Sequence, residues 1–369
     1  MNNIFQWLSL VNDIRQQAKV KHLMKDIIII VFFAALANAD DWEDIHCFAK
    51  KQEKFLRKYL ELPHGIPSED TIRRVFGIVS PEFLQEFSKR WNEVMNHKTK
   101  EKFKKIMGID GKTQRGNGTA NQKPNHIVSA VDNNGFCVGE VRVSDKSNEI
   151  TAIPELLNNI NIKGSIITID SMGCQTKIAR IIRKREADYL LALKGNHETL
   201  YNDVKLYFDD VELLSGCSYT FTKEKAHNNI ETREYWQTNN LSWLSTNGDW
   251  ADLTTICMTK NTIIKKDGTK TTETRYFISS LPLDVKEMAR AIRSHWMVES
   301  YHWHLDVTFR EDANKTLDKW AAYNLNIIKK MSLNTLKLVD VGIKRISLKK
   351  KRYAISLDFE GFLDGLLAV

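Results

Sequence analysis

Two short segments, KIMGID and SIITID, constrain the fold of this chain most strongly. Each is a run of mainly apolar residues that leads directly into an aspartate, Asp110 in the first and Asp170 in the second. Runs of this length, bounded by polar and turn-forming residues, are typical of buried strands. Helical patterns alternate with the later strand-like segments, which predicts an α/β fold with a mixed sheet. Because ligands bind beyond the carboxyl ends of strands in such sheets, both aspartates are candidate functional residues.

The segment 291–312, AIRSHWMVESYHWHLDVTFRED, carries a second functional pattern. We predict a helix from about Val285 to Phe309. Polar residues recur in it at intervals of three or four, which places them on one helix face: His295, Glu299, His302, Asp306 and Arg310. Apolar residues on another side are suited to packing on a core. The polar face either lies in water or completes a site begun elsewhere.

Asp110, Asp170 and Glu299 would together form a cluster of three carboxylates. Such groups repel one another unless they are protonated or bridged by cations. Oxygen ligands suit Mg²⁺ or Mn²⁺, and two such ions can promote phosphoryl transfer. Each residue also has an ordinary interpretation, as a turn residue, a loop residue or a solvated helix residue. Glu311 and Asp312 are alternatives for the third carboxylate.

Five segments follow from the changes of pattern along the chain. We predict an N-terminal helical domain over 1–104, with a role in DNA binding or assembly. An α/β core over 105–196 and 281–345 is interrupted by a β-rich insertion over 197–280. A basic C-terminal tail occupies 346–369. In the core, Asn133-Asn134-Gly135 predicts a hairpin turn between two strands.

The N-terminal domain is predicted from several helical patterns. The apolar run Ile27–Ala37 is too short to span a bilayer and predicts a buried helix. Further helices are expected over Trp42–Tyr59, after the helix-capping Ser68, and over Pro81–His97. Their basic residues suit either a DNA-binding module or a scaffold with solvated charges: Arg73, Arg74, Lys89 and Arg90.

Charge and cysteine content narrow the function classes. The net charge is +8 and the pI about 9.0, which suits a polyanion partner but is equally common as an aid to solubility. The five cysteines are odd in number and lack CxxC spacing. Neither a disulfide framework nor a zinc site is therefore indicated, and a reducing compartment is expected. The first residues lack the features of a signal peptide.

Several strings together resemble one known family. GIDGKTQRG, ITIDSMGCQ, YLLALKGNH, HWMVESYHWHLDVTFRED and the N-terminal GIPSEDTIRRVF occur in the order found in bacterial insertion-sequence DDE transposases. The closest type is the H-repeat-associated (ISAs-type) family. The resemblance covers essentially the whole chain. It implies an RNase H-like catalytic core, a mixed sheet flanked by helices, with a β-rich insertion and an N-terminal helical domain.

The resemblance also implies an activity and its partners. Asp110, Asp170 and Glu299 match the family's catalytic, metal-binding carboxylates, which would hold two Mg²⁺ or Mn²⁺ ions. The expected reaction is cleavage and strand transfer at the ends of an insertion sequence. The expected partners are terminal inverted repeats and target DNA, bound by a homodimer in the bacterial cytoplasm or nucleoid. A nuclease without strand transfer and an inactive DNA-binding remnant are the alternatives.

Some positions depart from related transposases. The broader group has Arg four residues before the Glu and Lys seven after it, where this chain has His295 and Asp306. These substitutions are typical of the ISAs-type subgroup, so the phosphate contacts of the broader group do not transfer. A His-Gly-Arg-like element is expected in the insertion, but the segment His227–Arg233 lacks that pattern, which leaves its role open.

Other polar residues are candidates for contacts with DNA: Lys112, Arg115, Lys194, Asn196, His295 and His302. The first four are predicted in loops that follow strands, where solvated or turn-forming roles are also possible. The two histidines share the Glu299 face, where a supporting role in the core is an alternative, and Asp306 is a candidate further metal ligand. Trp296 and Trp303 suit either base stacking or core packing.

Overall fold

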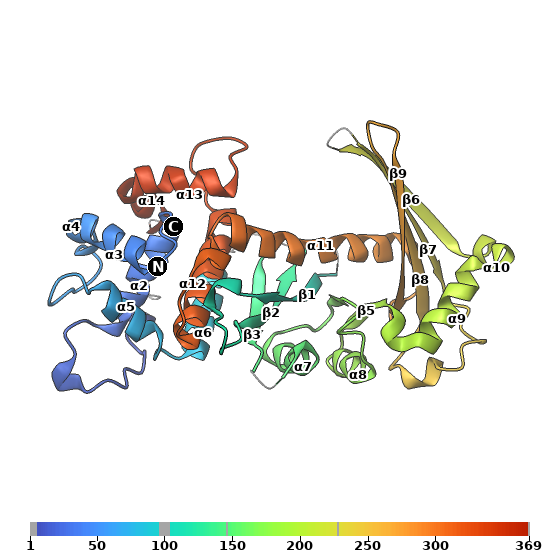
Figure 1. The fold of residues 1–369 in the computed structure, drawn as a ribbon, viewed down its shortest axis with the longest axis horizontal. Coiled ribbons are helices and arrows are strands. Elements are labelled where there is room, and N and C mark those ends of the chain that lie inside the picture. The colour runs from blue at the N-terminus through green and yellow to red at the C-terminus, as the bar shows by residue number, and fades with distance from the viewer. Residues whose placement is uncertain (1–5, 96–103, 145–146, 227–228, 368–369) are drawn as a thin grey trace. The chain divides into compact units, whose positions relative to one another are not determined.

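The computed structural model describes residues 6–95, 104–144, 147–226 and 229–367. The chain divides into two units, each built from separate stretches of sequence. One unit contains Met1–Lys100, Lys112–Ile127 and Ser300–Val369, and the other contains Glu101–Gly111 and Val128–Glu299. Figure 1 shows the helices and strands of both units.

Within the described residues, nine strands form one sheet in the order β3-β2-β1-β4-β5-β9-β8-β7-β6. The sheet is mixed, because β1, β4 and β5 are parallel and the pairs from β5 through β9, β8 and β7 to β6 are antiparallel. The strand bounds are β1 Ile106–Thr113, β2 His126–Asp132, β3 Cys137–Arg142, β4 Ile166–Ile169, β5 Asp188–Leu193, β6 Ser218–Ala226, β7 Asn229–Thr238, β8 Thr255–Ile264 and β9 Lys270–Ser279.

Helices cover both faces of this sheet (Figure 1). On one face, α7 (Glu149–Asn159) and α8 (Thr176–Lys184) share an apolar cluster with alternate strand residues such as Met107 and Ile167. On the other face, α11 (Val285–Val307) shares a smaller cluster with Ile106 and Ile166. This alternation follows from the two-residue period of a strand and explains why the strands are apolar on both sides.

Most predicted strands and helices of the core are confirmed, with one correction. The first strand does not end at Asp110, since β1 continues to Thr113. The β-rich segment extends the core sheet, because β9 pairs with β5. Two helices, α9 (Glu198–Asp209) and α10 (Val211–Ser215), precede its strands. The hairpin between β2 and β3 is confirmed, with Gly135 at a φ of 77°.

The other unit is built around α12 (Lys319–Leu338). Every residue from Ala321 to Leu336 is buried, so this helix packs on all sides. Its neighbours include α2, α5 and α6. The further helices are α2 Met24–Leu36, α3 Trp42–Lys51, α4 Glu53–Leu56, α5 Glu69–Phe76, α6 Pro81–Met95, α13 Leu348–Leu357 and α14 Phe359–Leu367.

These helices confirm the helical character predicted for the described N-terminal residues. The buried helix at Ile27–Ala37 is observed as α2, whereas the helix predicted over Trp42–Tyr59 is interrupted at Gln52. Residues 96 and 97 of the predicted helix Pro81–His97 lie outside the described residues. No helix among those described is long and apolar enough to cross a membrane.

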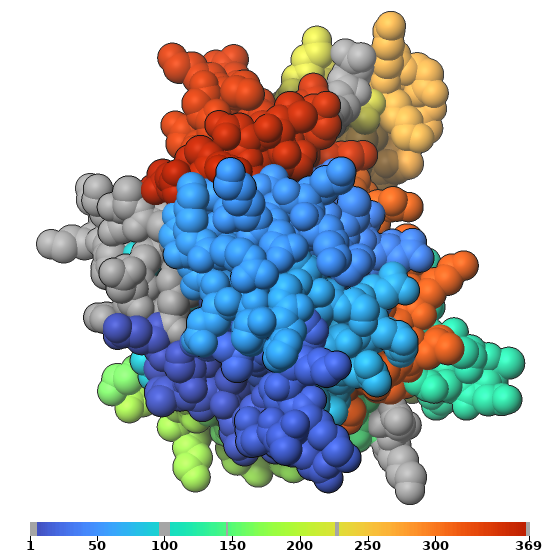
Figure 2. Space-filling view, turned by 90° about the vertical axis from the view of Figure 1, so that its left-hand side faces the viewer, coloured from blue at the N-terminus to red at the C-terminus, as the bar shows by residue number. Residues whose placement is uncertain are grey.

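N-terminal and C-terminal helices of the chain pack together in this unit (Figure 2). The buried Arg352 of α13 donates hydrogen bonds to the carbonyl oxygens of Ala35, Ala39 and Thr308. Its guanidinium also forms an ion pair with Asp40 at 2.9 Å. One side chain therefore satisfies several buried acceptors that the end of α2 and the loop after it would otherwise leave unpaired.

Replacing Arg352 by Met should lower the free energy of unfolding by roughly 3–5 kcal/mol, because a largely buried carboxylate and several carbonyl groups lose their partner. Urea unfolding followed by circular dichroism measures the change. Lys350→Met is the matched control, since Lys350 is exposed on the same helix. Equal midpoints for the two variants would contradict a stabilising role for Arg352.

Candidate active site

The register of β1 against β4 brings two predicted site residues together. The strands are parallel, and Ile109 pairs with Ile169. Asp110 follows Ile109 and Asp170 follows Ile169, so the backbones of the two aspartates are neighbours toward the carboxyl ends of these strands. This is the arrangement predicted from the two strand-like segments.

Both aspartates also belong to the same face of the sheet. Ile106 and Ile166 contact the cluster under α11. Side chains alternate between faces along a strand, so residues two and four positions later return to the same face. Asp110 and Asp170 each lie four positions later, which puts them on the side of the sheet that α11 covers. Both are half-buried.

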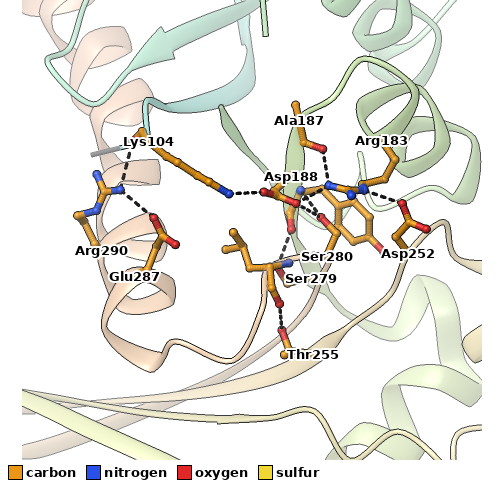
Figure 3. A network of polar contacts seen from close by, with 12 residues as sticks. Lys104, Arg183, Ala187, Asp188, Asp252, Thr255, Ser279, Ser280, Glu287 and Arg290 are labelled. Atoms are coloured by element: carbon orange, nitrogen blue, oxygen red, sulfur yellow. Dashed lines mark hydrogen bonds and ion pairs between the residues drawn. The ribbon is translucent and has the colours of Figure 1, made fainter. Parts of the chain in front are cut away.

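A polar network anchors the start of α11 near the start of β1 (Figure 3). Arg290 of α11 donates a hydrogen bond to the carbonyl oxygen of Lys104 at 3.1 Å. The Lys104 ammonium forms an ion pair of 2.7 Å with Asp188, the first residue of β5. Asp188 also pairs with Arg183 and accepts a hydrogen bond from Ser280. The network ties the helix to the start of β1 and to β5, two strands that β4 separates.

Farther along, α11 lies very close to β1 at Gly108. A Cβ atom at this glycine would lie 3.2 Å from Val298 Cγ1 and 3.3 Å from the His295 carbonyl oxygen. The His295 ring reaches the next strand, where its Nδ1 lies 2.9 Å from Thr168 Oγ1. Glycine therefore permits the close approach of helix and strand backbones.

These contacts also determine where Glu299 lies along the sheet. Arg290 is near Lys104 and His295 is near Gly108, so helix and strand run in the same direction. The step from His295 to Glu299 advances the helix about 6 Å. The step from Gly108 to Asp110 advances the strand by about the same distance. Glu299 is exposed, and it lies about as far beyond His295 along the helix as Asp110 lies beyond Gly108 along the strand.

The electrostatics agree with this convergence. Burial raises the pKa of Asp170, and the nearby Asp110 carboxylate raises it further, against the lowering effect of the Gly173 backbone N–H. Burial lowers the pKa of His295, while Asp110, Glu299 and Asp170 all act to raise it. His295 is thus within electrostatic range of all three carboxylates.

The carboxylates supply the oxygen donors that Mg²⁺ and Mn²⁺ prefer. Repulsion between Asp110 and Asp170, with burial, would be relieved by a bound cation. The side chains are not already gathered around a metal position, because no group of three or more His, Cys, Asp or Glu in the described residues meets that requirement. A shared ion would have to draw the exposed Glu299 toward the two aspartates.

Lys112 and Arg115, predicted as phosphate contacts, have carboxylate partners within their own unit. The Lys112 ammonium lies 2.8 Å from Asp306, 3.0 Å from Glu311 and 3.2 Å from Asp312. Its side chain is only 10% exposed. Arg115 is 84% exposed, and its backbone N–H donates to Asp312. Arg115 is therefore accessible to a phosphate, whereas Lys112 is occupied by ion pairs.

Glu311, an alternative for the third carboxylate, is almost fully buried. Burial by itself raises its pKa, but Lys112, Lys330 and Lys329 more than compensate, so that the pKa lies below its usual value. Asn326 and Gln114 also donate hydrogen bonds to it. These contacts occupy Glu311 and favour Glu299 as the third carboxylate.

The remaining predicted DNA contacts are spread over both units. Asn196 donates a hydrogen bond of 2.8 Å to the carbonyl oxygen of Ser171, which ties its loop to the residue after Asp170. Lys194 is exposed in the same loop, and His302 is buried on α11. Asn196 therefore lies beside the residue that follows Asp170, while the DNA-binding roles of Asn196, Lys194 and His302 stay predictions.

The structure corrects one alternative and adds two residues. Trp296 and Trp303 are each 56% exposed, so the core-packing interpretation is wrong for both. Gly108 and Thr168, which position α11, were not predicted as part of the site. A glycine inside an apolar strand is the signal that could have revealed the close backbone approach at Gly108.

The segment His227–Arg233 is only partly described. His227 and Asn228 lie outside the described residues. Arg233 is in β7 and pairs with Glu224 at 3.0 Å and with Glu231. Its ion pairs with these carboxylates join β6 and β7.

Comparisons with known proteins identify the family. A family described as "Transposase DDE domain" matches residues 96–335, and "DDE_Tnp_1-associated" matches residues 5–92. The chain belongs to the transposase DDE domain family. Its mixed sheet with flanking helices is accordingly an RNase H-like core, and the predicted fold class is confirmed.

Two relatives named as transposases match nearly the whole chain. "Putative transposase YncI" of Escherichia coli O157:H7 is 38% identical over 96% of this chain and 93% of its own length. "H repeat-associated putative transposase YhhI" of Escherichia coli (strain K12) is 34% identical over 94% of each chain. A short relative named "Inactive transposase YbfQ", from the same strain, matches only 20% of this chain at 36% identity. The predicted resemblance to H-repeat-associated transposases is confirmed.

Gly108→Ala should lower the free energy of unfolding by about 1–3 kcal/mol, because the new methyl group must displace α11 from β1. Gly195→Ala is the control, since nothing lies within 4 Å of a Cβ at that position. Urea unfolding of the two variants provides the measurement. If Gly108→Ala proves as stable as Gly195→Ala, the helix does not approach the strand as closely as described.

Glu311→Gln should destabilise the chain by roughly 1.5–3 kcal/mol at neutral pH, the usual contribution of hydrogen bonds to a charged group. The folded pKa of Glu311 is lowered, so its contribution is present above the unfolded value near 4.5 and is lost as pH falls through the folded value. The gap between wild type and variant should therefore narrow below pH 4.5. Unfolding midpoints at several pH values test this.

Glu93→Gln, on the exposed side of α6, is the control for Glu311→Gln. It should leave the unfolding midpoint nearly unchanged at every pH. A gap between wild type and Glu311→Gln that stays constant down to acid pH would show that the buried carboxylate does not titrate as described.

Proposed function

We propose that this transposase cuts a phosphodiester at each end of an insertion sequence and joins the freed 3′-hydroxyl to target DNA. The observation that carries the proposal is the shared sheet face of Asp110 and Asp170, with Glu299 on the helix that covers it. The membership of the chain in the transposase DDE domain family supports the same reaction.

In this proposal Asp110, Asp170 and Glu299 are the catalytic residues that would hold two Mg²⁺ or Mn²⁺ ions. Such ions, when bound, activate the attacking oxygen and stabilise the leaving oxygen of a phosphodiester. His295 acts as a positioning residue, because its ring joins α11 to Thr168 one helical turn before Glu299. Asn196 supports the loop after Asp170 through its hydrogen bond to Ser171.

DNA binding would draw on the net charge of +8, which supplies affinity that does not depend on sequence. Lys194 and Arg115 are accessible cations for phosphate contacts. In the helical unit built around α12, Arg73 and Arg90 are partly exposed and suited to recognition of the ends of the insertion sequence. Because two ends must be joined to one target, we propose a homodimer on the DNA.

A strand-transfer assay with a labelled element end, target DNA and Mg²⁺ tests the proposal. Asp170→Asn should reduce both cleavage and joining by about 100- to 1000-fold, the scale of removing a group that stabilises transition-state charge. Chelation of the metal should abolish both reactions. Gel electrophoresis of the labelled strand separates cut from joined products.

Glu155→Gln is the control, because Glu155 is an exposed carboxylate on α7, which covers the opposite sheet face. It should cut and join like the wild type. Cleavage without joining would favour a nuclease. If Asp170→Asn retained full activity, these carboxylates would not be the active site. No activity in the wild type, despite intact DNA binding, would favour an inactive remnant.

A further inference from the structure

The loops that follow β4 and β5 meet beside Asp170. The two strands are parallel neighbours, so both loops leave the sheet at the same edge. The first loop, residues 171–175, connects Asp170 to α8, and the second loop, residues 194–197, connects β5 to α9. Both loops belong to the sheet-containing unit. Contacts between them involve His197, a residue that has no part in the site described above.

The first loop orients the Asp170 carboxylate through its own backbone. The Oδ1 atom of Asp170 accepts hydrogen bonds from the backbone N–H groups of Met172 and Gly173, at 3.1 and 3.3 Å. Within the described residues, both hydrogen bonds recorded for this carboxylate go to Oδ1, which leaves Oδ2 for a cation. The positions of the two N–H groups therefore decide where the free oxygen points.

Side chains of the second loop hold the first loop at both ends. Asn196 donates a hydrogen bond of 2.8 Å to the carbonyl oxygen of Ser171, and His197 Nε2 lies 2.5 Å from the carbonyl oxygen of Cys174. A carbonyl oxygen only accepts hydrogen bonds, so Nε2 of His197 carries the proton and donates it. The backbone N–H groups that bind Asp170 lie between these two points of attachment.

The His197 ring is itself held by the segment between β7 and β8. It meets the Trp250 ring edge to face, with ring centroids 5.3 Å apart and an interplanar angle of 73°. Trp250 is buried in the same apolar cluster as Leu200 of α9. Aromatic pairs favour this geometry, so the contact restricts the orientation of the imidazole as well as its place. The β-rich segment is thereby connected to the loop that follows Asp170.

We propose that His197 is a positioning residue for Asp170, which holds the end of the first loop so that Oδ2 stays available to a divalent cation. Asn196 holds the start of the same loop, and Trp250 holds the imidazole. The inference rests on the proposed function, because it explains how one of the three carboxylates is oriented. The essential contact is the hydrogen bond from Nε2, which a side chain that only fills space does not supply.

Mn²⁺ binding to the full chain without DNA tests the proposal independently of catalysis. Electron paramagnetic resonance measures the free ion, and the binding component that Asp170→Asn removes defines the carboxylate site. His197→Phe keeps a ring against Trp250 but loses the donor. It should weaken this component by about 10- to 100-fold, the range for losing a group that orients a metal ligand. His197→Gln should restore most of the affinity, because its amide nitrogen can replace Nε2 as the donor.

Val204→Ala is the control for a general loss of stability. Val204 is buried on α9 in the same apolar cluster, so its truncation should lower the unfolding temperature by leaving a cavity. It should leave Mn²⁺ affinity unchanged. Hydrogen exchange provides a second readout, since the amides of Met172 and Gly173 should exchange faster in His197→Phe than in Val204→Ala. In the cleavage assay, His197→Phe should raise the Mg²⁺ concentration that gives half the maximal rate more than it lowers that maximal rate.

Unchanged Mn²⁺ affinity in His197→Phe would overturn the proposal, as would an equal loss in Val204→Ala. Binding by His197→Gln as weak as that of His197→Phe would also contradict it, because the hydrogen bond would then not be what holds the loop. Failure of the proposed function has a different signature. Full Mn²⁺ affinity in Asp170→Asn would contradict the carboxylate site itself, whereas a loss in Asp170→Asn with none in His197→Phe would contradict the positioning role alone.

Discussion

The close packing of α11 on β1 at Gly108 is the constraint on which the candidate site depends. A side chain at this position would meet both the Val298 side chain and the backbone of His295. The absence of a Cβ lets α11 lie close enough to the sheet for His295 to contact Thr168 on the next strand, β4. Helix register, rather than any contact between the carboxylates, thus determines where Glu299 lies along the sheet.

The polar network at the start of α11 complements this packing. Arg290 joins the helix to the residues before β1, and Lys104 joins the same residues to Asp188 of β5 (Figure 3). The hydrophobic effect is not directional, whereas hydrogen bonds and ion pairs require particular atoms to meet, so these polar contacts add to the specificity of the helix register. The two kinds of contact together define both the distance of α11 from the sheet and its register along β1.

The two strands that lead to Asp110 and Asp170 and the Glu299 helix could be predicted, because each depends on local periodicity. The apolar runs before Asp110 and Asp170 mark strands, and the spacing around Glu299 marks a helix. The pairing of β5 with β9 could not be predicted, because the paired residues are far apart in sequence and many strand orders satisfy the same pattern. Sequence periodicity locates elements, whereas the order of strands depends on the packing of the whole chain.

The same distinction applies to individual side chains. Lys112 looks like a loop cation in the sequence, but carboxylates about two hundred residues later enclose it, and no local pattern indicates them. The sequence leaves Trp296 and Trp303 suited either to the core or to base stacking, and both are exposed in the structure. Burial of a single residue is decided by distant partners, so it is the property that sequence predicts least well.

The discontinuous helical unit has a consequence for how the chain is made. Its central helix α12 begins at Lys319, long after α6 ends at Met95, and Arg352 follows later still. During synthesis, the N-terminal helices therefore emerge without the partner that buries them, while the sheet-bearing residues between them are completed first. A ribosome that stops early releases a chain whose first hundred residues have no finished core. Loss of the last few dozen residues is thus expected to disable the opposite end of the protein.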